Sequence, residues 1–310
     1  MKILVTGAAG FIGFHLCRKL LSLGHIVVGL DNFITGTRQN INLLSENRNF
    51  IFHERDINFL FILQKKILEV EQIYHLACPT GVDNLMPLAE EMLTTCSAGT
   101  KNILEIARTN GAKFLFTSSS EVYGNPKISP QKENYTGNVD IIGVRSPYEE
   151  GKRFAESLIT AYVTKYKIDA RIVRVFNTYG PAMSQSDTRV IPRFLRQAMT
   201  GQPLTVKGRG VQKRTFCYVD GLIDGLIKVM EKGKIGEAYN LGSNVETAII
   251  DLAKLIIKIT GSKSKIQFVS RPPHDHQRRL PDLKKVRKLG WQPKIGLEDG
   301  LKITAKWFGS

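Results

Sequence analysis

The stretch Ile3-Leu4-Val5-Thr6-Gly7-Ala8-Ala9-Gly10-Phe11-Ile12-Gly13 predicts how the chain begins to fold. Its apolar start is typical of a buried strand, and apolar residues at helical spacing follow the last glycine, at Leu16, Leu20 and Leu21. A glycine turn between a strand and a helix lets the backbone approach a diphosphate at the helix N-terminus, where free N–H groups and the helix dipole favour negative charge. The order of strand, turn and helix therefore predicts a dinucleotide-binding unit.

A second predicted strand supports this interpretation. The strand is expected at residues 25–30, which are mostly apolar, and it ends at Asp31, about 20 residues after the glycines, where an acid that binds ribose is expected. A carboxylate there accepts hydrogen bonds from both hydroxyls of an unmodified ribose and repels a 2′-phosphate. Arg38 could accept such a phosphate, but its place after the turn Gly36-Thr37 favours a solvated loop charge. We therefore expect NAD rather than NADP, with a purely structural glycine turn as the less favoured alternative.

Strand and helix patterns alternate over residues 1–180, which is typical of a parallel doubly wound sheet. Further strands are expected at residues 49–53, 72–76, 113–117 and 170–175, and helices at 60–70, 87–110 and 146–167. Beyond Gly180-Pro181 the pattern weakens, with helices near 191–200, 221–232 and 246–260. We predict an α/β fold: a Rossmann-type NAD-binding domain over residues 1–180 and a smaller C-terminal substrate-binding lobe over residues 181–310, with some segments crossing back.

Composition narrows the class of protein. The chain has 310 residues, and no apolar run reaches the ~20 residues that a membrane helix needs. Met1-Lys2 leads directly into a strand, so no signal peptide is expected. The four cysteines are scattered, without the spacing of metal ligands, and we expect buried free thiols in a reducing cytoplasm. They are Cys17, Cys78, Cys96 and Cys217.

The formal net charge of +16 is unusually high. Much of it lies late in the chain, at Arg271, Arg278, Arg279, Lys284, Lys285, Arg287 and Lys288. A nucleic-acid surface and a basic surface that attracts anionic substrates would both explain it. No interleaving of aromatic and basic residues, zinc-ligand spacing or helix-turn-helix pattern accompanies the charge, so nucleic-acid binding is not expected.

A polar cluster follows the strand expected at residues 113–117. It begins at Ser118 and includes Ser119, Ser120 and Glu121, and ligands of open α/β sheets bind beyond the carboxyl ends of strands. Tyr148 and Lys152 are spaced i, i+4 and so share one helix face. A phenol has a pKa near 10, and a nearby ammonium together with a positive nicotinamide ring would lower it. Tyr148 could then accept a hydroxyl proton while Ser119 holds the reacting oxygen.

The chain resembles the extended short-chain dehydrogenases/reductases that act on nucleotide sugars, over residues 3–307. Within that group it most resembles the decarboxylases of UDP-glucuronate. The segments that carry the resemblance are the glycine turn, Asp31-Asn32-Phe33, His75-Leu76-Ala77-Cys78-Pro79, Ser120-Glu121-Val122-Tyr123-Gly124-Asn125-Pro126, Tyr148-x-Glu150-Gly151-Lys152-Arg153, Arg174-Val175-Phe176-Asn177-Thr178-Tyr179-Gly180-Pro181, Arg189-Val190, Arg214-Thr215-Phe216-x-Tyr218-Val219 and Leu289-Gly290-Trp291.

The resemblance implies an activity and a set of site residues. Tyr148 and NAD oxidise C4 of UDP-glucuronate, the β-keto acid loses carbon dioxide, and hydride returns to C4 to give UDP-xylose. Glu121, Ser120 and a late arginine orient the ring and manage the proton at C5; Arg279 matches that arginine best, with Arg278 one place away. The implied cofactor contacts, besides Tyr148 and Lys152, are Gly7, Gly10, Phe11, Ile12, Gly13, Asp31, Asn32, Asp56, Ile57, Leu76 and Ala77, and the implied UDP-sugar contacts are Asn177, Arg189, Arg214 and Tyr218.

Ser120-Glu121 distinguishes the decarboxylases from related enzymes, because 4,6-dehydratases carry Asp-Glu there and 4-epimerases carry small residues. Other positions depart from the decarboxylase pattern: residues 80–84 read Thr-Gly-Val-Asp-Asn, Cys96 replaces an asparagine, and Lys207 replaces an aromatic residue. If Asp83 faced the site, it would repel a carboxylate. Another NAD-dependent nucleotide-sugar epimerase or dehydratase is therefore the alternative. A non-catalytic NAD- and RNA-binding protein is the second alternative, although Ser119, Tyr148 and Lys152 argue against it.

The helices expected at residues 87–110 and 146–167 have apolar stripes on more than one face. The corresponding helices of the family pair across a dimer, so the resemblance implies a homodimer.

Overall fold

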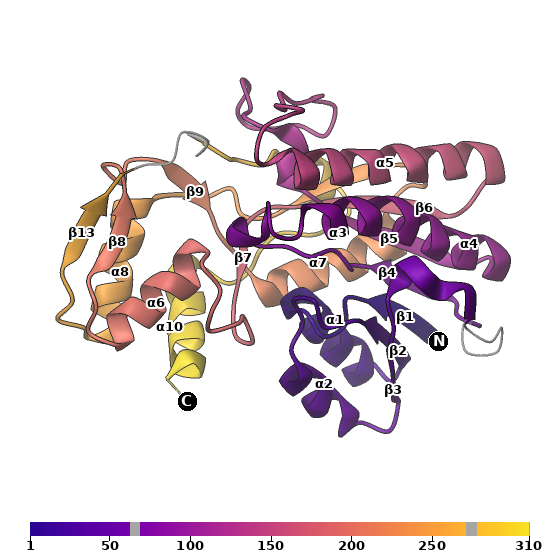
Figure 1. Ribbon diagram of the computed structural model, residues 1–310, viewed down its shortest axis with the longest axis horizontal. Helices are drawn as coiled ribbons and strands as arrows, with labels where there is room; N and C mark the ends of the chain where they lie inside the picture. The colour runs from indigo at the N-terminus through magenta and orange to yellow at the C-terminus, as the bar shows by residue number, and fades with distance from the viewer. Residues whose placement is uncertain (63–68, 271–277, 310) are drawn as a thin grey trace.

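The computed structural model describes residues 1–62, 69–270 and 278–309, and a parallel sheet lies at its centre (Figure 1). In this part of the chain the sheet has seven strands in the order β11-β6-β5-β4-β1-β2-β3. They are β1 (Lys2–Thr6), β2 (Ile26–Asp31), β3 (Phe50–Glu54), β4 (Gln72–His75), β5 (Lys113–Ser119), β6 (Ala170–Val175) and β11 (Ala238–Leu241). The strand order reverses between β1 and β4, which is where ligands bind in doubly wound sheets. The predicted Rossmann-type α/β fold is confirmed.

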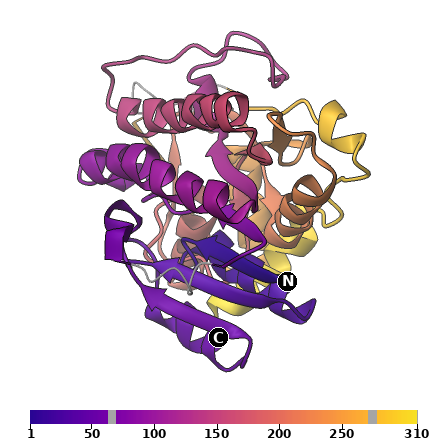
Figure 2. The ribbon, with the colours of Figure 1, turned by 90° about the vertical axis from the view of Figure 1, so that its right-hand side faces the viewer.

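Two helical layers cover the sheet, and the alternation of side chains along each strand explains both (Figures 1 and 2). Ile3 and Val5 point into a core shared with α1 (Phe11–Ser22), α2 (Arg38–Ser45) and α7 (Val219–Lys232). Leu4 points to the opposite core, which contains α4 (Thr100–Asn110) and α5 (Ser146–Tyr166). With both faces covered, β1 and most of β2 are apolar on both faces, as buried parallel strands are.

A smaller lobe lies at one end of the sheet (Figure 1). Its helices are α6 (Val190–Met199), α8 (Ile249–Thr260) and α10 (Leu297–Phe308), with the short α9 (Lys284–Arg287) nearer the sheet. Three two-stranded pairs complete it: β7 (Thr178–Tyr179) with β10 (Cys217–Tyr218), β8 (Leu204–Lys207) with β13 (Ile266–Val269), and β9 (Lys213–Thr215) with β12 (Glu246–Ala248). Although they follow residue 180, α7 and β11 pack on and extend the central sheet.

The long helix expected at residues 87–110 runs over residues 89–110, but it is not α-helical throughout. Helix α3 (Ala89–Thr94) is followed by a π-helical turn (Thr95–Gly99) before α4 begins. The Thr100 hydroxyl donates to the Thr95 carbonyl at 3.2 Å inside this turn. A Cβ at Gly99 would lie 2.8 Å from a methyl group of Ile57, so the turn packs closely on the segment after β3. Such π-helical turns occur inside α-helices, and the helical pattern of the sequence does not predict this one.

Other elements differ less from expectation. Residues 246–248 form β12 rather than the first turn of α8. Of the helix expected at 60–70, only a short 3-10 segment, Ile57–Ile62, is described, and residues 63–68 lie outside the described chain. In the ranges that the structure covers, no helix has the length and apolarity needed to cross a membrane.

Several of the late basic residues form ion pairs rather than an open basic surface. Arg278 pairs with Glu246, Arg279 with Glu121 and Lys285 with Glu237. Arg271 lies outside the described residues.

Candidate active site

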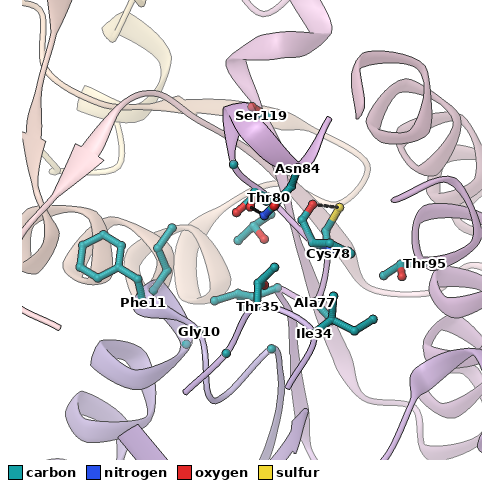
Figure 3. A pocket seen from close by; sticks show the side chains of 18 of the residues that line it. Gly10, Phe11, Ile34, Thr35, Ala77, Cys78, Thr80, Asn84, Thr95 and Ser119 are labelled. Carbon is teal, nitrogen blue, oxygen red and sulfur yellow. Dashed lines mark hydrogen bonds between the residues drawn. The ribbon is translucent and has the colours of Figure 1, made fainter. Parts of the chain in front are cut away.

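A cavity of about 700 Å³ opens at the carboxyl ends of the central strands. Figure 3 shows part of its wall, with Gly10 and Phe11 on one side, Ser119 above, and Ala77, Cys78 and Thr95 opposite. The structure brings most of the predicted site residues to this one cavity: Gly7, Gly10, Phe11, Ile12, Gly13, Asp31, Asn32, Asp56, Ile57, Leu76, Ala77, Ser119, Ser120, Glu121, Tyr148, Lys152, Asn177 and Arg189 all line it.

The backbone of the glycine turn forms one wall of the cavity. Gly7 has a φ of +73°, and a Cβ there would lie 2.9 Å from the backbone nitrogen of Ala77. A Cβ at Gly13 would lie 1.9 Å from the Gly7 carbonyl oxygen, so only glycine fits. Helix α1 begins after Gly10 without a side-chain cap or an acidic residue in its first turn. Its first N–H groups are therefore available to an anion, which is what a dinucleotide diphosphate needs.

Asp31 lies at the end of β2, facing the glycine turn. Its carboxylate accepts hydrogen bonds from the backbone N–H of Ala9 at 3.0 Å and of Phe33 at 2.8 Å. Burial raises the pKa of Asp31 above its usual value, and the hydrogen bonds from these backbone donors oppose this rise only in part. A carboxylate has about four lone-pair sites, so this fixed group retains acceptors for the two ribose hydroxyls of a dinucleotide.

Arg38 is engaged elsewhere. Its guanidinium donates to both carboxylate oxygens of Glu54, at 3.0 and 2.9 Å, and lies over the Phe33 ring. Because this exposed pair occupies the guanidinium, the structure favours the solvated role expected for Arg38 over a 2′-phosphate contact.

Asn32 and Asp56 form the far wall of this half of the cavity. The Asn32 amide donates to Asp56 at 3.1 Å, and the other Asp56 oxygen accepts from the Asn58 backbone at 2.8 Å. These bonds hold β2 and β3 together just beyond their ends. Ile57, which is 5% exposed, adds an apolar surface beside them, suited to an aromatic base.

Tyr148, Lys152 and Ser119 come together at the opposite end. Lys152 is buried in α5, where its ammonium donates to the Thr117 carbonyl at 2.9 Å and lies 6.0 Å from the centre of the Tyr148 ring. The Ser119 hydroxyl hydrogen-bonds with Tyr148 closely enough to lower the pKa of the phenol. The helix spacing and the strand end thus produce the predicted constellation of phenol, ammonium and hydroxyl.

The electrostatics of this group differ in part from the expectation. Burial raises the pKa of Tyr148 to about 12, and the Lys152 charge lowers it by less than burial raises it. Burial also disfavours the Lys152 ammonium, but neighbouring acidic groups, Cys78 first, raise its pKa to about 12. The chain by itself therefore keeps a neutral phenol beside a permanent positive charge.

Glu121 is held between two guanidinium groups. Arg279 donates to Glu121 at 2.9 Å, to Ser120 at 3.3 Å and to the Gly124 carbonyl at 3.1 Å. Arg145 forms an ion pair with the same Glu121 oxygen and donates to Glu149 at 3.2 Å. Arg279 is 4% exposed and lies behind Ser120 and Glu121, whereas Arg145 lines the cavity.

Arg145 was not predicted from the sequence. It precedes the first residue of α5 and lies three residues before Tyr148, where a single arginine gives no motif. Its importance follows from the tertiary contact with Glu121, to which it presents its guanidinium from the cavity side.

Replacing Arg145 by glutamine should lower kcat/KM roughly tenfold, because a charge-assisted hydrogen bond that fixes Glu121 is lost. Steady-state kinetics on the nucleotide-sugar substrate measure this change. Arg108→Gln is the matched control, since it breaks an arginine–glutamate pair on the surface. Equal activities of the two variants would show that Arg145 does not position Glu121.

The residues predicted to bind the nucleotide sugar fall into two groups. Asn177 and Arg189 line the cavity; Arg189 donates to Asp187 at 2.9 Å. Arg214 lies on β9, away from the described cavity wall, so its contact with the UDP portion stays a prediction. Tyr218 is buried against Tyr179 beneath α10 and does not line the described cavity, so its contact with the UDP-sugar also stays a prediction.

The divergent residues 80–84 form the rim of the cavity. Asp83 is exposed there, and its charge raises the pKa of Arg193 in α6, although burial lowers that pKa by more. The Asn84 amide donates to the Thr80 carbonyl at 2.8 Å, which closes the loop on itself. The Asp83 charge therefore faces the site, but with a cation of the lobe close by.

Comparisons with known proteins agree with this geometry. The sequence model for GDP-mannose 4,6-dehydratase matches residues 4–304. UDP-glucuronic acid decarboxylase 1 of Xenopus tropicalis is 42% identical over 308 residues, which cover 99% of this chain and 72% of that protein. UDP-glucuronic acid decarboxylase 4 of Arabidopsis thaliana is 42% identical over 309 residues, covering 99% of this chain and 68% of the relative.

A solved structure shares the whole architecture. The UDP-glucuronic acid 4-epimerase of Bacillus cereus, in complex with UDP-glucuronic acid and NAD, superposes with a TM-score of 0.90 at 32% identity and covers 100% of this chain and 99% of that one. The chain belongs to the GDP-mannose 4,6-dehydratase family of extended short-chain dehydrogenases/reductases, and within it to the group of the UDP-glucuronic acid decarboxylases.

Proposed function

We propose that the protein is an NAD-dependent enzyme that converts UDP-glucuronate to UDP-xylose and carbon dioxide, with NAD regenerated in every cycle. The observation that carries this proposal is the placement of Glu121 between Arg145 and Arg279, next to Ser119, Tyr148 and Lys152 in one cavity. The 42% identity to UDP-glucuronic acid decarboxylases over 99% of the chain supports it.

The cavity fits NAD by its own geometry. The glycine turn leaves room for a diphosphate, Asp31 presents a fixed carboxylate for a ribose, and Ile57 offers an apolar surface for a base. When bound, NAD would supply the hydride acceptor for C4 and a positive charge that favours the Tyr148 phenolate. Gly10, Gly13 and Asp31 would hold its adenosine diphosphate half, and Lys152 would hold the nicotinamide half.

Proton transfer at C4 belongs to Tyr148. As a phenolate, which the fixed charge of Lys152 stabilises, Tyr148 takes the proton of the C4 hydroxyl while the carbon is oxidised. Ser119 holds the C4 oxygen by a hydrogen bond. The carboxyl group is then β to a ketone, so the C5–C6 bond breaks with its electron pair moving toward the C4 oxygen.

The two hydroxyl groups that held the C4 oxygen also stabilise the resulting oxyanion. Ser119 and Tyr148 face it from the strand end and the helix. Glu121, with its two arginine partners, orients the ring near C5 together with Ser120, where a proton replaces the lost carboxylate. Asn177 and Arg189 would contact the diphosphate of UDP, because both reach the same cavity from the lobe side.

A product assay tests this proposal. Incubation with a panel of UDP- and dTDP-sugars, read by mass spectrometry, should show loss of carbon dioxide from UDP-glucuronate alone, with a UDP-pentose as product. Release of a stable C4 epimer would favour the epimerase alternative, and loss of water from a neutral hexose would favour the dehydratase alternative. Either result would contradict the proposal.

We further propose a homodimer in the cytoplasm. Large apolar side chains on α3 and α5 are exposed, among them Leu93 at 43% and Phe154 at 52%, and a second copy would cover them. The free cysteines, three of them buried and Cys78 partly exposed, suit a reducing compartment.

A further inference from the structure

Two cysteines far apart in sequence meet at the wall of the cavity. The sulfur of Cys78 lies 3.6 Å from the sulfur of Cys96, and the residues are 18 positions apart. Cys78 follows β4, lines the cavity and is partly exposed, whereas Cys96 is 1% exposed. Figure 3 shows Cys78 beside the opening, with Thr95, the residue before Cys96, on the neighbouring helical segment. One sulfur is therefore reachable from the cavity and the other lies directly behind it.

The π-helical turn holds Cys96 in this place. The turn is fixed by the Thr100–Thr95 hydrogen bond and by the close approach of Gly99 to Ile57. On its other side Cys96 packs on Gly151, where an added Cβ would lie 3.3 Å from that of Cys96. Gly151 precedes Lys152 in α5. Cys96 therefore packs against the same helical turn that carries the catalytic lysine.

The two thiols have different chemical characters. A hydrogen bond from Cys96 lowers the pKa of Cys78 to about 7, with burial opposing and the Lys152 charge assisting. The same hydrogen bond and burial raise the pKa of Cys96. A thiolate is the reactive form of cysteine, so Cys78 is the nucleophile of the pair. Burial instead raises the pKa values of Cys17 and Cys217.

We propose that Cys78 and Cys96 form a reversible disulfide site in the wall of the cofactor cavity, oxidised by hydrogen peroxide or another hydroperoxide. The Cys78 thiolate attacks a peroxide oxygen, the O–O bond breaks, and the hydroxide that leaves takes up a proton to give water and a sulfenic acid. The Cys96 sulfur then attacks the Cys78 sulfur, and the sulfenic hydroxyl departs with the Cys96 proton as a second water. Two thiols are thus oxidised by two electrons while one peroxide is reduced to two waters.

Closing the bond needs only a small movement. The sulfurs must approach from 3.6 Å to about 2.05 Å, a shift of about 1.5 Å that draws the segment after β4 toward the π-helical turn. This segment carries Leu76 and Ala77 on the cavity wall, and Gly151 adjoins Cys96. We therefore expect oxidation to lower turnover and a dithiol reductant to restore it. Bound NAD would cover Cys78 and slow its oxidation.

Peptide mapping of the full chain tests the site directly. After treatment with hydrogen peroxide, the four free thiols should fall to two, and one linked peptide pair should contain Cys78 and Cys96, with both changes reversed by dithiothreitol. The Cys96→Ser variant should stop at a sulfenic acid on Cys78 that dimedone traps, whereas Cys17→Ser should link as the unmodified protein does. An unchanged thiol count, a link between other cysteines, or a sulfinic acid on Cys78 without a link would overturn the proposal.

Repeating the peroxide treatment in the presence of NAD tests the location of the disulfide site independently of the proposed function. Saturating NAD should slow the linkage, and an equal rate with and without NAD would overturn the placement of the site on the cofactor wall. Neither arm requires turnover of UDP-glucuronate, so failure of the proposed reaction would leave the disulfide result intact.

Discussion

Replacing Tyr148 by phenylalanine should lower kcat by on the order of 10³- to 10⁴-fold, because it removes the phenolic oxygen that accepts the C4 proton. The ring packing is retained, and Lys152 keeps its hydrogen bond to the Thr117 carbonyl. NAD should therefore still bind, while formation of NADH in a single turnover with UDP-glucuronate disappears. Absorbance of NADH in rapid mixing measures the chemical step, and fluorescence titration measures cofactor binding.

Tyr166→Phe is the control for this change. Tyr166 lies at the last turn of the same helix and is 41% exposed, so the variant removes a phenolic hydroxyl far from the cavity. Its activity should equal that of the unmodified enzyme. Unchanged turnover in Tyr148→Phe would refute the role given to this residue. A joint loss of turnover and of NAD affinity would assign it to binding instead.

Replacing Asp31 by asparagine should weaken NAD binding on the order of 100-fold. The carboxylate accepts from the Ala9 and Phe33 backbone groups and, with NAD bound, from two ribose hydroxyls. An amide of the same shape offers one acceptor oxygen instead of two, and a hydrogen bond to a charged group contributes about 1.5–3 kcal/mol. Isothermal titration with NAD measures the change, which should leave kcat nearly unaffected at saturating cofactor.

Glu54→Gln is the control for Asp31→Asn. It loosens the exposed Arg38–Glu54 pair without touching the cavity, so NAD affinity should stay the same. Equal NAD affinity in Asp31→Asn and the unmodified protein would show that the ribose does not bind at this carboxylate. A gain of NADP binding in Glu54→Gln would show that Arg38 is a phosphate site after all.

Local sequence patterns were enough to predict the fold, the cofactor-binding residues and the tyrosine–lysine pair of the site. The glycine turn could be predicted from the sequence because Gly7 and Gly13 lie against backbone atoms that leave no room for a side chain. Asp31 could be predicted because it ends a strand at a fixed distance from that turn. Tyr148 and Lys152 could be predicted as a pair because one helical turn separates them. In each case the signal lies within one element or one strand–turn–helix unit.

Contacts between distant segments escaped prediction for a physical reason. Arg145 matters only because β5 ends opposite the start of α5, which brings Glu121 within its reach. The π-helical turn depends on how Gly99 packs on Ile57, and the pairing of Cys78 with Cys96 follows from that turn. The burial of Tyr218 against Tyr179 likewise follows from the packing of α10. Such positions are set by tertiary structure rather than by local sequence pattern.

The central claim is that this chain decarboxylates UDP-glucuronate without net reduction of NAD. The most direct test incubates the enzyme with UDP-glucuronate labelled with ¹³C at C6 and with NAD at the concentration of the enzyme. The account predicts many equivalents of labelled carbon dioxide per enzyme, a matching amount of UDP-pentose, and no accumulation of NADH. One NADH for each carbon dioxide released, or full retention of the label in a C4 epimer, would contradict it.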